Sequence, residues 1–255
     1  MILTIDIGNT RVKWLLFHGE VAAENGVFEY KLDTFKKSFI SEGVPLKGAA
    51  IVIANVAGSR LEKILTELLE VSECESYVYA QTQKRQCGIV NSYTDCSRLG
   101  VDRWLAMIAG FKHKKRAEGE PVCIIDCGTA MTLDVVDASG CHLGGVIAPG
   151  YRLMQSMLVE KTSDINEFEA DMTVSSVHLA KQTNDAVRQG CIQLLVGGLD
   201  RMIARYAESQ KNKMCCIVTG GDADWVAKLL ESEAVIEPML VNQGLWYVSK
   251  RNKKS

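Results

Sequence analysis

Two segments of the chain place a carboxylate next to small, flexible or hydroxyl-bearing residues at the end of an apolar run. In the first segment, MILTIDIGNT (1–10), the apolar residues predict a buried strand that contains Asp6. The residues GNT (8–10) accept a tight turn, so they predict a hairpin whose returning strand is RVKWLLF (11–17). Turn amides beside a carboxylate suit a Mg²⁺-bound phosphate, although an ordinary hairpin with a buried, hydrogen-bonded aspartate has the same pattern.

The same pattern returns in VCIIDCGTAMTLDVVD (122–137), where Asp126, Gly128 and Thr129 follow an apolar run. Two copies of D-x-G with a nearby threonine suggest two similar half-domains, each offering a phosphate-binding hairpin to a shared cleft. In these two hairpins the chain resembles the actin, Hsp70 and sugar kinase group. The resemblance implies that ATP binds between two ribonuclease-H-like lobes.

Strands and helices alternate between the two hairpins. AAIVIANVAG (49–58) predicts a strand, SRLEKILTELLE (59–70) has the apolar spacing of a helix, and SYVYA (76–80) predicts another strand. This alternation indicates an α/β protein whose helices cover a mixed sheet. With the resemblance above, we expect an N-terminal lobe over 1–115, a C-terminal lobe over 116–255 and an active-site cleft between them.

The composition is that of an ordinary globular protein, with 255 residues, 47% hydrophobic residues, 24% charged residues and a net charge of −2. This charge gives no general footprint for nucleic acid or an anionic membrane, so we expect neither as a partner. Basic runs at KHKKR (112–116) and KRNKK (250–254) are interpreted as solvated surface. No apolar run is long enough for a transmembrane helix.

Nine cysteines raise the question of a metal site or a disulfide framework. Their number is odd, no C-x-x-C pair occurs and no secretory apolar segment is recognised, so neither is expected. We interpret most of them as reduced, small core residues of a cytoplasmic protein.

The stretch QCGIVNSYTDCSRLGVDRW (86–104) is loop-like and rich in groups that can contact a ligand, among them Tyr93. The residues that follow predict a helix, so GVDR (100–103) falls at a loop-to-helix junction, where orphan N–H groups and the helix dipole favour anions. A carboxylate and a guanidinium there can serve as base and anion clamp. The structural alternative makes Asp102 a helix N-cap and puts Arg103 in a surface ion pair.

Three later segments complete the pattern. Residues 159–178 predict a mobile polar loop. A long helical pattern over 182–209 carries small residues such as Gly190 and Gly197, which allow another helix to come close at a lobe or subunit interface. MCCIVTGGDADWVAKLL (214–230) predicts a strand, a Gly-Gly turn and a helix, a junction that can pass the adenine and ribose of a nucleotide across its backbone.

Taken together, the motifs closely resemble those of type III pantothenate kinase over nearly the whole chain. The matching stretches, in the family's order, are DIGNTRVKW (6–14), NSYTDCSRLGVDRW (91–104), DCGTAMTLDVVD (126–137), HLGGVIAPG (142–150), QTNDAVRQG (182–190) and TGGDADWVAKLL (219–230). The resemblance implies ATP-dependent phosphorylation of pantothenate to 4′-phosphopantothenate, the first step of coenzyme A biosynthesis.

The resemblance also implies roles for single residues. Asp102 would accept the proton of the pantothenate hydroxyl, and Asp126 would bind a monovalent cation, K⁺ or NH₄⁺. The residues that would bind ATP with its Mg²⁺ are Asp6, Ile7, Gly8, Asn9, Thr10, Arg11, Val12, Lys13 and Thr129. The residues that would hold pantothenate are Tyr93, Gly100, Val101, Asp102, Arg103 and Thr183.

A homodimer is implied as well, because Thr183 would reach pantothenate from the partner subunit. The residue before it is Gln182, where the family commonly has Asn. Glutamine keeps the amide and adds one methylene group, so we expect the threonine contact to survive.

Two other functions fit parts of this pattern. A catalytically inactive accessory factor for gene expression on the same fold is the first, and the presence of Asp6, Asp102 and Asp126 argues against it. Another ATPase of the superfamily, such as a sugar kinase or a polyphosphate hydrolase, is the second. At 255 residues the chain has little room for the insertions usual in a sugar kinase.

Overall fold

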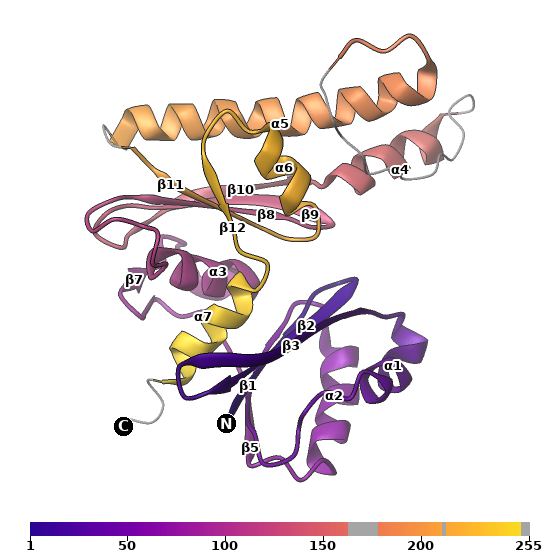
Figure 1. Ribbon diagram of the computed structural model, residues 1–255, viewed down its shortest axis with the longest axis vertical. Helices are drawn as coiled ribbons and strands as arrows, with labels where there is room; N and C mark the ends of the chain where they lie inside the picture. Colours follow the sequence, from indigo (N-terminus) through magenta and orange to yellow (C-terminus); the bar gives the residue numbers. More distant parts are fainter. Residues whose placement is uncertain (163–177, 211–212, 251–255) are drawn as a thin grey trace. The chain divides into compact units, whose positions relative to one another are not determined.

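The structure is a computed structural model that describes residues 1–162, 178–210 and 213–250 (Figure 1). The predicted polar loop over 159–178 and the basic run at 250–254 lie almost wholly outside the described residues.

The chain forms two compact units. Unit 1 comprises Met1–His113, Gly140–His142 and the C-terminal segment from Met239, and unit 2 comprises Lys114–Ser139 and Leu143–Pro238. The C-terminal segment differs from the lobes expected from the sequence, because it packs with unit 1 rather than with the lobe that precedes it in the chain.

Unit 1 contains a five-stranded mixed sheet in the order β3-β2-β1-β4-β5. Its strands are β1 (Ile2–Ile7), β2 (Arg11–His18), β3 (Val21–Glu29), β4 (Ala50–Asn55) and β5 (Ser76–Tyr79). The first three strands form an antiparallel meander, whereas β4 and β5 run parallel to β1. A short hairpin of β6 (Arg85–Gln86) and β7 (Ile89–Val90) follows the sheet.

Helices cover both faces of this sheet (Figure 1). The helices of unit 1 are η1 (Leu32–Thr34), α1 (Phe35–Ser41), α2 (Ser59–Glu70), η2 (Cys96–Arg98), α3 (Val101–Phe111) and α7 (Leu240–Ser249). Because side chains alternate along a strand, Leu3 and Ile5 of β1 enter the core that α1 and α2 complete on one face. On the other face α7 is fixed to the sheet by Asn242, whose Nδ2 donates to the Thr4 carbonyl at 3.2 Å.

Unit 2 repeats this architecture with its sheet in the order β10-β9-β8-β11-β12. Its elements are β8 (Val122–Cys127), β9 (Ala130–Val136), β10 (His142–Pro149), α4 (Tyr151–Lys161), α5 (Thr183–Gln210), β11 (Cys215–Thr219), α6 (Ala223–Leu229) and β12 (Ala234–Ile236). As in unit 1, the first hairpin strands are antiparallel and the last two strands run parallel to the first. The repeat predicted from the two D-x-G hairpins is thus confirmed as a repeat of whole sheets.

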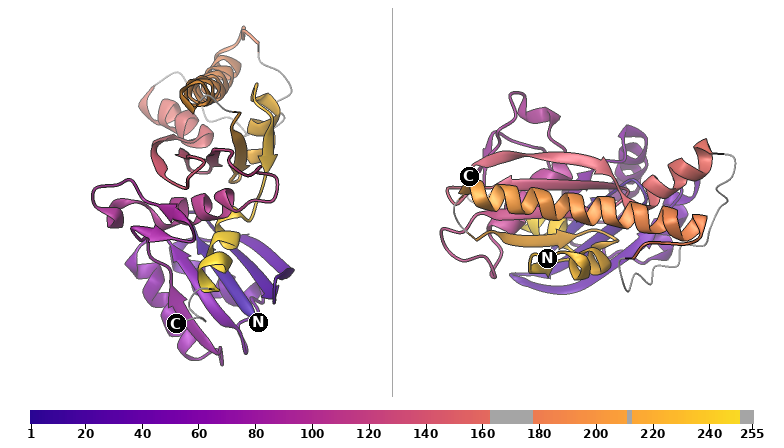
Figure 2. Two further views of the ribbon diagram at one scale, coloured as in Figure 1. Left: turned by 90° about the vertical axis from the view of Figure 1, so that its left-hand side faces the viewer. Right: turned by 90° about the horizontal axis from the view of Figure 1, so that it is seen from above.

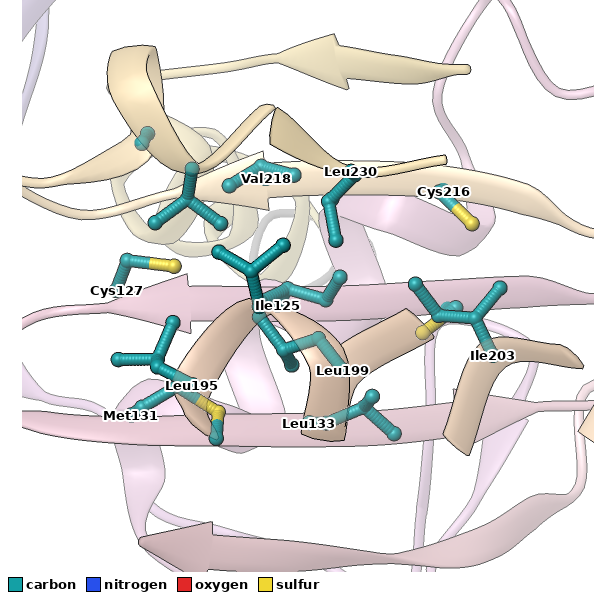
Figure 3. Packing of buried hydrophobic residues seen from close by; sticks show 14 of the residues in the cluster. Ile125, Cys127, Met131, Leu133, Leu195, Leu199, Ile203, Cys216, Val218 and Leu230 are labelled. Atoms are coloured by element: carbon teal, nitrogen blue, oxygen red, sulfur yellow. The ribbon is translucent and has the colours of Figure 1, made fainter. Parts of the chain in front are cut away.

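Helix α5 runs across one face of the unit 2 sheet (Figure 2, right). Leu195, Leu199 and Ile203, spaced one turn apart, point from α5 toward Ile125 and Leu133 on the strands (Figure 3). Cysteines fill part of this core, and six of the nine cysteines of the chain are buried as free thiols. Within the described parts of the chain, no helix combines the length and the apolar character needed to cross a membrane.

Candidate active site

The first hairpin brings a negatively charged and a positively charged side chain to the same face of the unit 1 sheet. Asp6, next to the last residue of β1, lies directly opposite Lys13 of β2. Directly opposed residues of antiparallel strands point to the same side, so the carboxylate and the ammonium group share one face. The turn between them is closed by the N–H of Gly8, which donates to the Arg11 carbonyl at 3.0 Å.

The predicted ATP-binding residues of this hairpin differ in what they can offer. Asn9 and Thr10 are exposed at the tip of the turn. Ile7 and Val12 are both 0% exposed, so they have only backbone groups to offer. The guanidinium of Arg11 is directed to β3, where it pairs with a glutamate, Glu29, at 2.9 Å.

Tyr30 supports the same turn, and the sequence analysis missed it. Its hydroxyl donates to the Gly8 carbonyl at 2.6 Å, and its N–H donates to the Thr10 carbonyl at 3.3 Å. Burial raises the pKa of Tyr30, so the hydroxyl stays protonated and remains a donor. No local motif surrounds this tyrosine, and only the pairing of β3 with β2 brings it to the turn.

The second hairpin, in unit 2, has the same geometry. Asp126, next to the last residue of β8, lies opposite Thr132 of β9 and beside Thr219 of β11. The N–H of Gly128 closes the turn at 3.2 Å, as Gly8 does in the first hairpin. Each unit therefore presents one aspartate at the end of its central strand.

Backbone from two other predicted motifs packs against this second turn. The N–H of Gly150 donates to the carbonyl of Thr129 at 3.0 Å. Gly220 has a φ of 97°, and a Cβ built on it would lie 2.6 Å from Oδ1 of Asp126. Both its backbone conformation and this close approach require glycine. The stretches HLGGVIAPG and TGG, far apart in the sequence, thus meet at one hairpin.

Negative charge gathers at the same place. Burial raises the pKa of the Cys127 thiol, and the nearby carboxylates of Asp126 and Asp222 raise it further. The N–H of Asp222 donates to the Cys127 carbonyl at 3.0 Å, which holds the start of α6 against the strand end. Two carboxylates thus act on the same thiol, which makes the surroundings of Cys127 electronegative.

The carboxylates at the two turns suit cations that need few protein ligands. Among the described residues, no group of three His, Cys, Asp or Glu side chains is placed to hold a metal ion. Mg²⁺ that accompanies a nucleotide needs only one or two carboxylates, because water and phosphate oxygens fill its other positions. Asp6, at the end of β1 beside the exposed first turn, fits this light coordination of Mg²⁺, and Asp126 offers one carboxylate to a cation at the second turn.

The predicted base lies in the first turn of α3. The helix begins at Val101, and Gly100 is its N-cap residue. Oδ1 of Asp102 accepts a hydrogen bond from the N–H of Arg103 at 2.8 Å, and a Cβ on Gly100 would lie 2.6 Å from that oxygen. Glycine at position 100 thus leaves room for the carboxylate. The alternative in which Asp102 is the N-cap is wrong, because Gly100 occupies that position.

Arg103 is held beside Asp102 by Tyr93. Arg103 is buried, with only 7% of it exposed, rather than on the surface as the structural alternative supposed. Nη1 donates to the Tyr93 hydroxyl at 3.1 Å, and the guanidinium carbon lies 5.9 Å from the centre of the tyrosine ring. The structure therefore brings three of the predicted pantothenate-binding residues together, with a fixed cation next to a carboxylate.

Hydrogen bonds of a buried asparagine and a lysine hold the loop that carries Tyr93. Asn91 is 0% exposed, and its Oδ1 accepts from the Tyr93 N–H at 2.9 Å while its Nδ2 donates to the Cys96 carbonyl at 3.3 Å. Nζ of Lys84, which the sequence analysis did not single out, donates to the Asn91 carbonyl at 2.8 Å. These bonds fix the position of the Tyr93 backbone.

Thr183 is far in the sequence from the other predicted substrate residues. It is the first residue of α5, and it is exposed. The turn around it is ordered by Asp185, which accepts from Arg188 at 2.8 Å and pairs with His178 at 2.9 Å. Hydrogen bonds from Arg188 and then His178 hold the pKa of Asp185 below its usual range.

The two duplicated sheets, each with a D-x-G hairpin, have the fold of solved structures described as sugar kinases. A protein from Sinorhizobium meliloti that is described as a 2-dehydro-3-deoxygalactonokinase has the same fold, with a TM-score of 0.57, 14% sequence identity and 99% of each chain covered. A Baf family protein from Campylobacter jejuni, described as a transcriptional activator, is similar in fold with a TM-score of 0.62 and 19% identity over the whole of both chains.

Sequence comparison narrows the assignment. Residues 2–205 match the model of the type III pantothenate kinase family. A type III pantothenate kinase from Nitrosococcus oceani is 34% identical over 257 aligned residues, which cover 100% of this chain and 96% of that protein. The chain belongs to the type III pantothenate kinase family.

Proposed function

We propose that this protein transfers the γ-phosphoryl group of ATP to the hydroxyl of pantothenate and forms 4′-phosphopantothenate, the first product on the route to coenzyme A. The observation that carries the proposal is the fixed Asp102–Arg103–Tyr93 arrangement at the start of α3 in a chain of this family. A base next to an anion clamp suits a substrate that has a hydroxyl at one end and a carboxylate at the other.

The first hairpin would bind the phosphates of ATP. The exposed tip at Asn9 and Thr10 offers polar groups to the phosphate oxygens, and Lys13 supplies positive charge on the same face. Asp6 would hold Mg²⁺ or its water, and bound Mg²⁺ offsets the charge of the phosphates. In unit 2, Thr129 would contact the nucleotide from the tip of the second hairpin.

Asp102 would act as the base. An alcohol is far from ionised at neutral pH, so its proton must leave as the bond from oxygen to phosphorus forms. A carboxylate needs only to be within hydrogen-bond reach of that hydroxyl, because phosphoryl transfer depends mainly on positioning and charge stabilisation. Arg103, with Tyr93, Gly100 and Val101, would hold the carboxylate end of pantothenate so that its hydroxyl meets Asp102.

Asp126 would bind a monovalent cation, K⁺ or NH₄⁺. The support is the second carboxylate of Asp222 nearby and the close backbone of Gly220. A monovalent cation at this turn would offset negative charge of the nucleotide phosphates where no lysine takes part.

We further propose a homodimer in which Thr183 contacts pantothenate bound to the partner subunit. The helices of unit 2 expose large apolar side chains that a second copy could cover, including Leu194 (71% exposed) and Met157 (49% exposed). All nine cysteines are free thiols, which fits a reducing compartment, and we place the enzyme in the cytoplasm.

A coupled kinase assay with pantothenate and Mg-ATP tests the proposal. Turnover should require both pantothenate and K⁺, and replacing K⁺ by Na⁺ should lower it. Turnover that is unchanged in Na⁺ would remove the cation site and keep the kinase. Folded protein that binds ATP yet phosphorylates no pantothenate in either buffer would support the accessory-factor alternative instead. The likeness to the Campylobacter jejuni protein does not favour that alternative, because it shows the fold alone.

A further inference from the structure

His142 is a buried polar residue to which the proposed reaction gives no role. It is 2% exposed, begins β10 and belongs, with Gly140 and Cys141, to unit 1. Backbone contacts hold this short segment beside the hairpin that leads into the pantothenate loop. The N–H of Val90 donates to the Gly140 carbonyl at 2.9 Å, and Val90 pairs with Cys141 in a parallel bridge.

Two glycines make this contact possible. Gly140 has a φ of 89° and Gly88 has a φ of 92°, values that favour glycine. A Cβ on Gly140 would collide with the Gly88 carbonyl, so the two backbones pack with no side chain between them. The place of His142 is therefore fixed by main-chain packing.

The imidazole of His142 backs the ring of Tyr93. The two rings are stacked, with centroids 6.0 Å apart and planes 17° from parallel. Nδ1 of His142 shares a hydrogen bond with Oγ of Ser92 at 3.2 Å, which ties the imidazole to the residue before the tyrosine. Tyr93 in turn accepts the hydrogen bond from Arg103 at 3.1 Å. Side chains from β10, the loop and α3 thus form one continuous stack.

We propose that His142 is a positioning residue for pantothenate binding. His142 holds the ring of Tyr93 in place, and the Tyr93 hydroxyl in turn holds the guanidinium of Arg103 in position for the substrate carboxylate. Because it is buried, His142 acts through Tyr93 and does not touch the substrate. The inference rests on the proposed function in one respect, the assignment of Arg103 to the carboxylate of pantothenate.

The test compares two substitutions that separate the ring from the hydrogen bond. His142→Gln removes the flat ring and keeps a polar group, whereas His142→Phe keeps the ring and removes the bond to Ser92. We expect the Gln variant to raise both the Kd and the KM for pantothenate by about 5- to 10-fold, the scale of one lost aromatic stack. The KM for ATP and the kcat should stay within about twofold, and the Phe variant should recover most of the loss.

A second readout follows the substrate carboxylate. Pantothenol carries a hydroxyl where pantothenate has its carboxylate, so it gains little from Arg103. The preference for pantothenate over pantothenol, measured by calorimetry, should shrink in His142→Gln and stay near the parent value in His142→Phe. A general loosening of the fold would weaken both ligands alike and would leave this preference unchanged.

His18→Gln is the matched control, because it makes the same exchange at an exposed histidine on β2. Folded His142→Gln protein with the parent's Kd for pantothenate would overturn the inference. An equal loss for pantothenate and pantothenol would also overturn it. Parent protein that binds pantothenate without phosphorylating it would contradict the proposed function and leave this binding test intact, whereas parent protein that binds no pantothenate would overturn both.

Discussion

The hydroxyl of Tyr30 donates to the carbonyl of Gly8 at 2.6 Å and so joins the end of β3 to the turn of the first hairpin. The bond connects residues that are 22 positions apart. It fixes the backbone of a turn whose N–H groups would face the phosphates of ATP. The structure thus supports this turn from a strand that carries none of the predicted site residues.

Tyr30→Phe should weaken ATP binding as well as the fold. The loss of one hydrogen bond to a half-buried carbonyl should lower the free energy of unfolding by about 1 kcal/mol. A turn that is less well fixed should raise the KM for ATP by about 5-fold, while the KM for pantothenate stays unchanged. Thermal unfolding and steady-state kinetics measure the two effects.

Tyr79→Phe is the control for this variant. The Tyr79 hydroxyl bonds Thr66 at 3.0 Å and donates to the Glu62 carbonyl at 3.2 Å, in the packing of β5 against α2. A similar loss of stability with no change in the KM for ATP is expected. If both variants change that KM alike, the effect of Tyr30 is on the fold as a whole.

The local patterns in the sequence predicted the two hairpins and the start of α3 because each depends on neighbours in the chain. Strand, turn and returning strand lie within about 16 residues in each hairpin, so period and turn chemistry suffice. The GVDR pattern could not decide between a base and an N-cap, because an acid near a helix start satisfies both. Only the place of Gly100 at the cap settles that the helix begins before Asp102.

The supports of the site could not be predicted, because they depend on packing between distant segments. Helix α7 packs within unit 1 against α3, where Gly244 meets the backbone of Leu105 so closely that a Cβ would collide with it. His142 reaches Tyr93 only through the folding of β10 beside the substrate loop. Neither contact leaves a periodic or short-range trace in the sequence.

The stability of the α5 start should depend on pH through Asp185. Its pKa is lower in the folded protein, through the hydrogen bonds from Arg188 and then His178. A carboxyl group of this kind adds stability above its unfolded pKa of about 3.9, and the contribution disappears as the pH falls through the folded pKa. Asp185→Asn should therefore lower the Tm at pH 5 to 6, with the difference from the parent vanishing in more acidic buffer.

Arg188→Gln offers the matched comparison, since it removes the first of the two partners and keeps the carboxyl group. It should show part of the same difference in Tm at pH 5 to 6. A difference between Asp185→Asn and the parent that persists unchanged to the lowest pH at which both fold would contradict the role of the carboxylate.

Asp126→Asn should weaken the response to K⁺. The exchange keeps the shape of the side chain and removes one of the two carboxylates beside Cys127. The Tm of the parent should be higher in KCl than in NaCl, because a ligand that binds the folded state raises the Tm. The variant should lose most of this difference. The K⁺ concentration for half-maximal turnover should rise by about tenfold, equal to the loss of about 1.4 kcal/mol of cation binding.

Asp137→Asn serves as the control for the cation site, because Asp137 accepts hydrogen bonds from Ser139 in the loop after β9. It should keep the parent's response to K⁺ in both measurements. The assignment of Asp126 would be wrong if Asp126→Asn retained the same gain in Tm and the same half-maximal K⁺ concentration.

Asp102→Asn should separate catalysis from folding. The Asn side chain keeps an oxygen that can accept from the Arg103 N–H, as Oδ1 of Asp102 does at 2.8 Å, so the start of α3 should remain intact. Without a carboxylate to accept the hydroxyl proton, kcat should fall by about 10²-fold or more, while the Kd for ATP measured by calorimetry stays within about twofold. Asp95→Asn is the control, since Asp95 lies in the same loop and accepts from the Ser97 N–H at 3.0 Å without a role in the reaction. If kcat in Asp102→Asn equals that of the Asp95 variant, Asp102 is a structural acid of the first helical turn and the base lies elsewhere.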